Sequence, residues 1–271
     1  MRIKHRFGFS SDKDIYNYLD KIGISYEKGD LVSVLTIFED DKRFEQIKSL
    51  FESKQIHPLT ETVYSPSELK DASWLSMRST WRNGYPLPKE NKEYIFSTYN
   101  TDTYCRQCGA GLIQKGNFTI EKEPRWGSRN FLMLNWIHDE LFISEKVASV
   151  LNNSSFLGFQ IKNVNDKMGN PHFSIYQLYI NQIIEQGLKN NSVSKVIYCN
   201  DCNRKRYLLK PGHIVYDRGV FENIDDDIIR SNEQFGEIVC ARMIFVSQRF
   251  YRFLVEKKLD RGLQFEPILL V

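Results

Sequence analysis

Four of the five cysteines in this chain form two identically spaced pairs, Cys105/Cys108 and Cys199/Cys202. Two intervening residues let both thiolates of a pair reach one ion from a tight turn. Gly109 follows the first pair and supplies the backbone freedom that lets amide N–H groups point at sulfur. Asn203 follows the second pair, and asparagine is the next-best residue for a left-handed conformation. The spacing therefore predicts two metal-binding knuckles.

The metal that suits four thiolates is zinc. Because four thiolates complete a tetrahedral shell, we expect one structural Zn²⁺ bound by Cys105, Cys108, Cys199 and Cys202, with no open position for catalysis. The alternatives are a redox-active pair or unpaired surface thiols, but a reducing compartment favours metal over disulfides. Nearby basic residues are available to offset the charge of the site: Arg106, Arg204, Lys205 and Arg206. Cys240 stands in an apolar run and is expected to be a buried, inert thiol.

Other polar groups support weaker hypotheses. The basic stretch 203–207 is consistent with phosphate contacts, although we favour charge compensation in a solvated turn. The run His138-Asp139-Glu140 invites a catalytic interpretation, but the apolar residues on both sides favour a polar turn. The acidic cluster at 222–227 lacks the ligand spacing of a calcium loop, so we expect a solvated helix start there. The chain has no HExxH, GxSxG, P-loop or GxGxxG motif, and we expect it not to be an enzyme.

Composition narrows the class of protein. The chain has 271 residues, 41% hydrophobic and 26% charged, which is ordinary for a globular protein. The 37 Lys and Arg against 34 Asp and Glu give a net charge of +3, too small an excess to indicate nucleic acid as the main partner. No apolar run reaches the length of a signal peptide or a membrane span. We therefore expect a cytoplasmic protein.

Short helices and strands alternate along the chain, which predicts an α+β fold with a mixed sheet. We expect an N-terminal α/β segment over 1–95 and a double-CxxC zinc-binding α+β domain over 96–271. In the first segment the patterns predict elements in this order: a strand at 3–9, a helix capped at 10–12, strands at 24–27 and 31–38, a helix containing Phe44, Ile47, Leu50 and Phe51, and a helix beginning at Ser65-Pro66.

Residues 142–164 and 245–268 share one pattern: a strand, a capping Ser, a short helix, a Gly turn and a second strand. The matching positions are Ser144 with Ser247 and Gly158 with Gly262. The offset between the segments changes from 103 to 104 in the loop before the glycine. Either the two segments are a duplicated unit, or any such strand–helix–strand element looks this way by chance.

Two irregular segments, 81–88 and 124–127, carry Trp, Tyr and Arg, the residue types enriched at binding hot spots. Partner binding and simple packing of loop aromatics explain this equally well. The residues we expect to contact a partner are Trp81, Tyr85 and Trp126.

The two CxxC knuckles far apart, the segment 171–180 before the second, and the ending from Phe245-Val246-Ser247 to Gly262-Leu263-Gln264-Phe265-Glu266-Pro267 resemble the double-CXXCG motif family. The resemblance covers residues 95–271, and Asn203 departs from the Gly of the second motif. The two pairs themselves look like the knuckles of a zinc ribbon, and their wide spacing indicates a long insertion between the hairpins. The resemblance implies an immunity-type protein that binds a cognate bacterial toxin. A nucleic-acid-binding zinc ribbon and an enzyme without a recognisable motif remain the alternatives.

Overall fold

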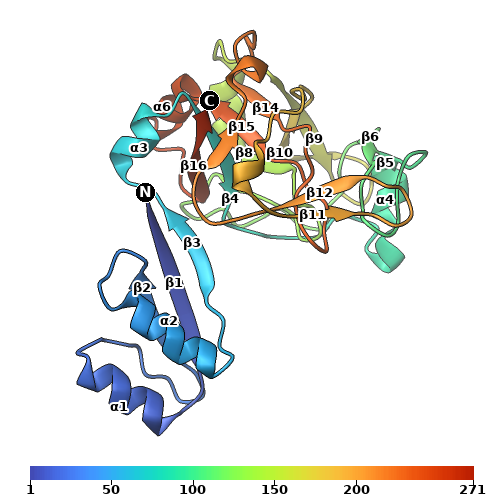
Figure 1. Ribbon diagram of the computed structural model, residues 1–271. Helices are drawn as coiled ribbons and strands as arrows, with labels where there is room; N and C mark the ends of the chain where they lie inside the picture. The colour runs from blue at the N-terminus through green and yellow to red at the C-terminus, as the bar shows by residue number, and fades with distance from the viewer. The chain divides into compact units, whose positions relative to one another are not determined.

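The computed structural model describes residues 1–271 and is an α+β protein with six α-helices and several sheets (Figure 1). The five-stranded sheet is mixed, because its β13–β16 pair is parallel and its other pairs are antiparallel. The expected α+β class with a mixed sheet is therefore confirmed. No helix combines the length and the apolar character needed to span a membrane.

The chain divides into two compact units, one of residues 1–68 with 211–213 and the other of residues 69–210 with 214–271. Residues 69–95, predicted to belong to the N-terminal segment, thus pack within the second unit. The boundary expected near residue 95 stays a prediction about independently folding domains.

Unit 1 is a three-stranded antiparallel sheet in the order β2-β1-β3, with two helices on one face. Its elements are β1 (Arg2–Phe9), α1 (Lys13–Lys21), β2 (Ser33–Phe38), α2 (Phe44–Ser53) and β3 (Leu59–Val63). A short helix, α3 (Pro66–Asp71), follows. The predicted strand at the N-terminus and all three predicted helices are confirmed.

The strand expected at 24–27 is wrong, because this segment makes only one isolated bridge, Glu27 to Val34. Ile24, together with Gly23 before it, instead forms the C-terminal end of α1. Gly23 has a φ of 66° and donates to Asp20 O, while Ile24 N donates to Leu19 O at 3.0 Å. This is a Schellman ending, which uses Ile24 as the apolar residue packed against the helix.

Unit 2 contains a five-stranded sheet in the order β13-β16-β4-β15-β14. Its strands are β4 (Trp74–Ser79), β13 (Ile214–Tyr216), β14 (Ile228–Arg230), β15 (Ile244–Ser247) and β16 (Leu263–Leu270). Helix α6 (Gln248–Glu256) connects β15 to β16. Because β4 is antiparallel to both, β15 and β16 run parallel with one strand between them.

The second sheet of this unit has the order β7-β8-β10-β9 and repeats that arrangement. Its elements are β7 (Phe131–Leu132), β8 (Leu141–Ser144), α5 (Glu145–Asn152), β9 (Phe159–Asn165) and β10 (Pro171–Ile180). Helix α5 connects β8 to β9, and β10 lies antiparallel between them. Side chains of both sheets and both helices share one buried cluster, which includes Ile143, Leu151, Val246 and Leu254.

The local structure predicted for residues 142–164 and 245–268 is confirmed at its four key positions. Ser144 caps α5 by accepting from Val147 N, and Ser247 caps α6 by accepting from Phe250 N. Gly158 and Gly262 have φ values of 96° and 92°, a left-handed conformation that favours glycine.

Two small hairpins complete the unit. One pairs β5 (Tyr99–Asn100) with β6 (Ile113–Gln114), and the other pairs β11 (Val193–Tyr198) with β12 (Lys205–Leu209). Helix α4 (Tyr94–Thr98) leads into the first of them. Three short 3₁₀ turns occupy Glu90–Lys92, Asn190–Ser192 and Arg218–Val220.

Candidate metal centre

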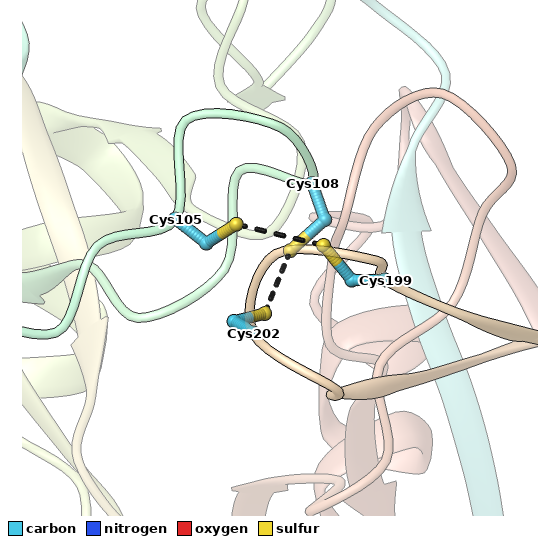
Figure 2. Close-up of side chains that lie close together, drawn as sticks. All are labelled: Cys105, Cys108, Cys199 and Cys202. Carbon is cyan, nitrogen blue, oxygen red and sulfur yellow. Dashed lines mark hydrogen bonds between the residues drawn. The ribbon is translucent and has the colours of Figure 1, made fainter.

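The four paired cysteines meet at one point, because each pair lies in the loop of one small hairpin. Cys105 and Cys108 lie between β5 and β6, and Cys199 and Cys202 lie between β11 and β12. All four Sγ atoms lie within 4.8 Å of one another. Figure 2 shows the two loops facing each other with their sulfur atoms inward.

The sulfur separations fit a four-thiolate metal site and are too long for disulfides. Cys105 Sγ lies 3.6 Å from Cys199 Sγ, and Cys108 Sγ lies 3.7 Å from Cys202 Sγ. A disulfide needs about 2.05 Å. Four sulfurs at the corners of a tetrahedron, each about 2.3 Å from a central ion, would be about 3.8 Å apart. The four cysteines are free thiols close enough to bind one metal ion.

The two knuckles have the same backbone conformation at the residue after the second cysteine. Gly109 N donates to Cys105 O at 2.8 Å, and Asn203 N donates to Cys199 O at 2.9 Å. The φ angles at the two residues are 80° and 57°. Asn203 therefore has the left-handed conformation expected of it, in the place where the first knuckle has glycine.

Arg204 joins the two knuckles. Its Nη1 donates to Thr103 O at 2.8 Å and to Ala110 O at 3.3 Å, so a side chain next to the second knuckle holds the backbone of the first. Gly111 leaves room for this contact. A Cβ at Gly111 would lie 1.9 Å from Thr103 O and 2.8 Å from Arg204 Nη1.

The other basic residues near the site have separate contacts. Arg206 donates to the carbonyl oxygens of Gly236 and Glu237, and Lys205 Nζ lies 5.7 Å from the Tyr198 ring centroid. Of the four residues expected to offset the charge of the site, Arg204 alone has hydrogen bonds that join the knuckles.

Burial and backbone dipoles act in opposite directions on two of the thiols. Burial raises the pKa of Cys108 to about 12. Burial also acts to raise the pKa of Cys199, but the backbone N–H groups of Cys202 and Asp201 outweigh it and lower that pKa to about 7. A metal that binds here must displace the Cys108 proton.

Cys240 packs against this cysteine cluster but belongs to neither knuckle. Its Sγ lies 2.9 Å from Gln234 Oε1, and burial raises its pKa to about 11. The expectation of an inert thiol agrees with this, although Cys240 is only partly buried.

The aromatic residues expected to contact a partner lie outside this centre. Trp81 and Trp126 pack edge to face with ring centroids 5.6 Å apart, and both are half-buried against a core cluster. Trp126 Nε1 donates to Ser174 O at 2.8 Å. Tyr85 is exposed and packs against Trp136. A role in partner binding stays a prediction for all three.

The helix start expected at the acidic cluster 222–227 is wrong. These residues form no helix, and Asp227 is buried. The Asp227 carboxylate accepts from Leu157 N at 3.0 Å and from Ser247 Oγ at 2.7 Å, and it pairs with Arg249. One acidic residue of the cluster is therefore a structural link between β14 and α6.

Sequence reasoning also missed a buried ion pair. Glu140, expected in a polar turn, is buried and accepts two hydrogen bonds from Arg230, at 2.9 and 2.7 Å. Gln177 Nε2 donates to the same carboxylate at 2.8 Å. The one signal in the sequence was a carboxylate directly before the apolar run 141–143; nothing pointed to Arg230, which lies 90 positions away.

The chain matches no protein-family model, and no curated protein matches it. The function must therefore be argued from the residues and their geometry.

Proposed function

We propose that the cysteine cluster binds one zinc ion and that this ion is structural. Zinc and iron are the metals usually held by four thiolates, and zinc requires no redox chemistry. Four thiolates leave no coordination position for water or substrate. The ion would hold together two hairpins whose cysteines are 94 residues apart in the chain.

Metal analysis of the purified protein tests this proposal. We expect about one zinc per chain, and we expect Cys105→Ser and Cys202→Ser to give misfolded protein, since structural zinc contributes about 10–16 kcal/mol in small zinc-finger peptides. The control is Cys240→Ser, which should keep its zinc. Protein that holds iron, or no metal, would contradict the proposal.

We further propose that the protein acts by binding another protein, as an immunity-type protein that neutralises a cognate bacterial toxin. This proposal rests mainly on the four-thiolate site. An ion bound by four thiolates stabilises the fold and has no free position for catalysis, so the protein would act through binding at its surface. The near-neutral net charge and the resemblance to the double-CXXCG motif family support it. Such an inhibitor needs a rigid scaffold and an interface of about 1,600 Å² in total.

Co-expression with the product of the neighbouring gene tests the immunity role. The toxin alone should arrest growth, and the toxin with this protein should not. A pull-down should recover both chains. If neither binding nor protection is found with any neighbouring product, the immunity role is wrong.

An enzyme is the second candidate, because His138 lines a surface hollow. Its Nδ1 lies 3.1 Å from Arg82 Nη2, and burial followed by the Arg82 charge lowers its pKa. Because a guanidinium only donates, Nδ1 accepts from Arg82 and the neutral ring carries its proton on Nε2, which could donate a hydrogen bond to a substrate. Turnover of a small molecule that is lost in His138→Gln would favour this function over recognition.

We also propose that residues 142–164 and 245–268 descend from one duplicated unit. Asn130 and Asp227 occupy matching places before β7 and β14. Ser144 N donates to Asn130 O, and Ser247 N donates to Asp227 O.

The contacts between the two segments are reciprocal. Asp227 N donates to Leu157 O, just before Gly158, and Asn130 N donates to Arg261 O, just before Gly262. Each Gly turn thus contacts the start of the strand that pairs with the other repeated segment, as expected for two copies related by a twofold axis. In related chains, the segment equivalent to 142–164 should align with the segment equivalent to 245–268 at these positions. If the two segments align no better than unrelated strand–helix–strand elements do, the duplication is wrong.

A further inference from the structure

Two adjoining hollows lie beside the metal centre, with volumes of about 590 and 700 Å³. They share a wall made by His138, Asp139, Ala241 and Arg242, and the first extends to Cys108 and Gly109 of the knuckle. Together they are lined by seven basic side chains and three acidic ones. This excess of four positive charges is larger than the net charge of the whole chain, +3, so the positive charge of the protein is concentrated here.

Much of this positive charge lacks a carboxylate partner within the protein. Arg82 contacts His138 Nδ1, a neutral acceptor, and Arg204 donates to backbone carbonyls. Arg242 Nε is buried without a hydrogen bond, whereas the buried Arg230 is paired with Glu140. The charges of Arg82, Arg204 and Arg242 are therefore available to carboxylates supplied from outside.

Exposed aliphatic side chains lie around the first hollow. They include Ile113, Ile183, Val239 and Ile238, which is 86% exposed. Ile238 lies in a short closed loop, because Phe235 and Ala241 exchange two backbone hydrogen bonds, at 2.8 and 3.1 Å. Gly236 makes the loop tight, since a Cβ there would lie 2.1 Å from Val239 O. The backbone that carries Ile238 is therefore closed into a tight loop without any partner.

We infer that these two hollows are the docking site for an acidic segment of a protein partner, with carboxylates against Arg82, Arg242 and Lys92 and an apolar residue against Ile238 and Val239. This inference rests on the proposed protein-binding function and names its surface. An acidic peptide fits better than a nucleic acid, because four of the five exposed apolar side chains around the first hollow are aliphatic and only Trp136 is aromatic, whereas single strands are held by stacking on aromatic rings. A hollow of this volume accepts several side chains.

The test uses the full-length, metal-loaded protein and a displayed library of random 12-residue peptides. Selection should enrich peptides that contain several Asp or Glu residues and one or two large apolar residues. The tightest peptide, labelled with fluorescein, then gives an affinity by fluorescence anisotropy. Ile238→Asp and Arg82→Glu should each weaken binding by at least about tenfold, and added salt should weaken it further.

Two exposed positions outside the hollows provide matched controls. Met168→Asp is the control for Ile238→Asp, because both place a negative charge at an exposed apolar position in a loop. Lys146→Glu is the control for Arg82→Glu, because both reverse an exposed positive charge. Both controls should bind the peptide as the wild type does. Metal content and circular dichroism confirm that all four variants are folded.

Three results would overturn the inference: no acidic enrichment, equal binding by all four variants, or tight binding of a labelled single-stranded oligonucleotide that is lost in Arg82→Glu. The outcome is separable from that of the immunity role. If a cognate toxin binds the Ile238→Asp and Arg82→Glu variants normally, this site is wrong and the function stands. If acidic peptides bind at the site but no neighbouring gene product is neutralised, the function is wrong and the site stands.

Discussion

At the scale of single residues, the second knuckle has asparagine where the first has glycine, directly after its second cysteine, but the backbone has the same shape there. Asn203 adopts the conformation that Gly109 adopts, and both amides donate to the carbonyl oxygen of the first cysteine of their pair. Asparagine tolerates this region better than other residues with a Cβ. The departure from glycine therefore leaves the backbone turn of the knuckle unchanged.

Substitutions at Asn203 test this equivalence. We expect Asn203→Gly to keep full metal content and stability. Asn203→Val should cost about 1–2 kcal/mol, because a β-branched residue is strained at positive φ. Chemical unfolding of the metal-loaded variants measures both, and a valine variant as stable as the wild type would show that the left-handed turn is not required.

The protonation of Cys108 makes metal binding depend on pH. Because the pKa of this thiol is raised to about 12, it carries a proton throughout the neutral range, and binding must release at least that proton. Metal affinity should therefore rise with pH, by at least about tenfold per unit between about pH 6 and pH 8. Competition with a chelator of known pH dependence measures the slope, and a flat profile would contradict the protonated state.

At the scale of elements, the sequence could predict what short-range chemistry decides. The capping residues Asp12, Ser144 and Ser247 and the left-handed turns at Gly158 and Gly262 depend on neighbours within a few positions. The four paired cysteines could be predicted for the same reason, because the repeated spacing of two residues indicates that they bind one ion together.

The pairing of distant strands could not be predicted in this way. That β4 lies between β15 and β16, and β10 between β8 and β9, follows from tertiary packing. The burial of Glu140 and Asp227 could not be predicted either. In the sequence alone, a buried carboxylate with a distant partner cannot be distinguished from a carboxylate on the surface.

The two Gly turns differ in the room around them, which predicts unequal effects. A Cβ at Gly158 would lie 2.2 Å from Ile228 O, whereas a Cβ at Gly262 would lie 3.4 Å from Phe131 O. Gly262→Ala should cost about 1–2 kcal/mol from backbone strain alone. Gly158→Ala should cost about 1–3 kcal/mol more, because the backbone must move. Urea unfolding compares the two, and equal losses would contradict the close approach.

The Glu140–Arg230 pair links the start of β8 to β14. Arg230→Met would leave a buried carboxylate without its partner and should destabilise the protein by about 3–5 kcal/mol. The double variant Glu140→Gln with Arg230→Met removes both charges and should recover most of that loss. A double variant no more stable than Arg230→Met alone would show that the carboxylate charge is not the cause.

At the scale of the whole molecule, unit 1 has its own core and contains none of the cysteines. Ten buried side chains, among them Phe7, Leu35, Ile47 and Phe51, pack within residues 7–51. The sequence predicted most of its helices and strands because they are amphipathic and lie close together in the chain.

A fragment of residues 1–68 should therefore fold alone, although a domain of this size is only marginally stable. We expect a dispersed amide spectrum and a cooperative thermal transition, neither of which changes when a chelator is added. In the full-length protein, the same chelator should collapse the signals of unit 2 and leave those of unit 1. A fragment with the spectrum of an unfolded chain would contradict the independence of this unit.

The separation of the two knuckles along the chain has a consequence in time. Cys105 and Cys199 are 94 residues apart, so at about 5–20 residues per second a ribosome delivers the second half of the site roughly 5–20 s after the first. During that interval the nascent chain offers only two sulfurs to any ion. If the proposed ion is zinc, zinc shortage in a growing cell should consequently reduce the yield of newly made chains, while molecules completed before the shortage keep their metal.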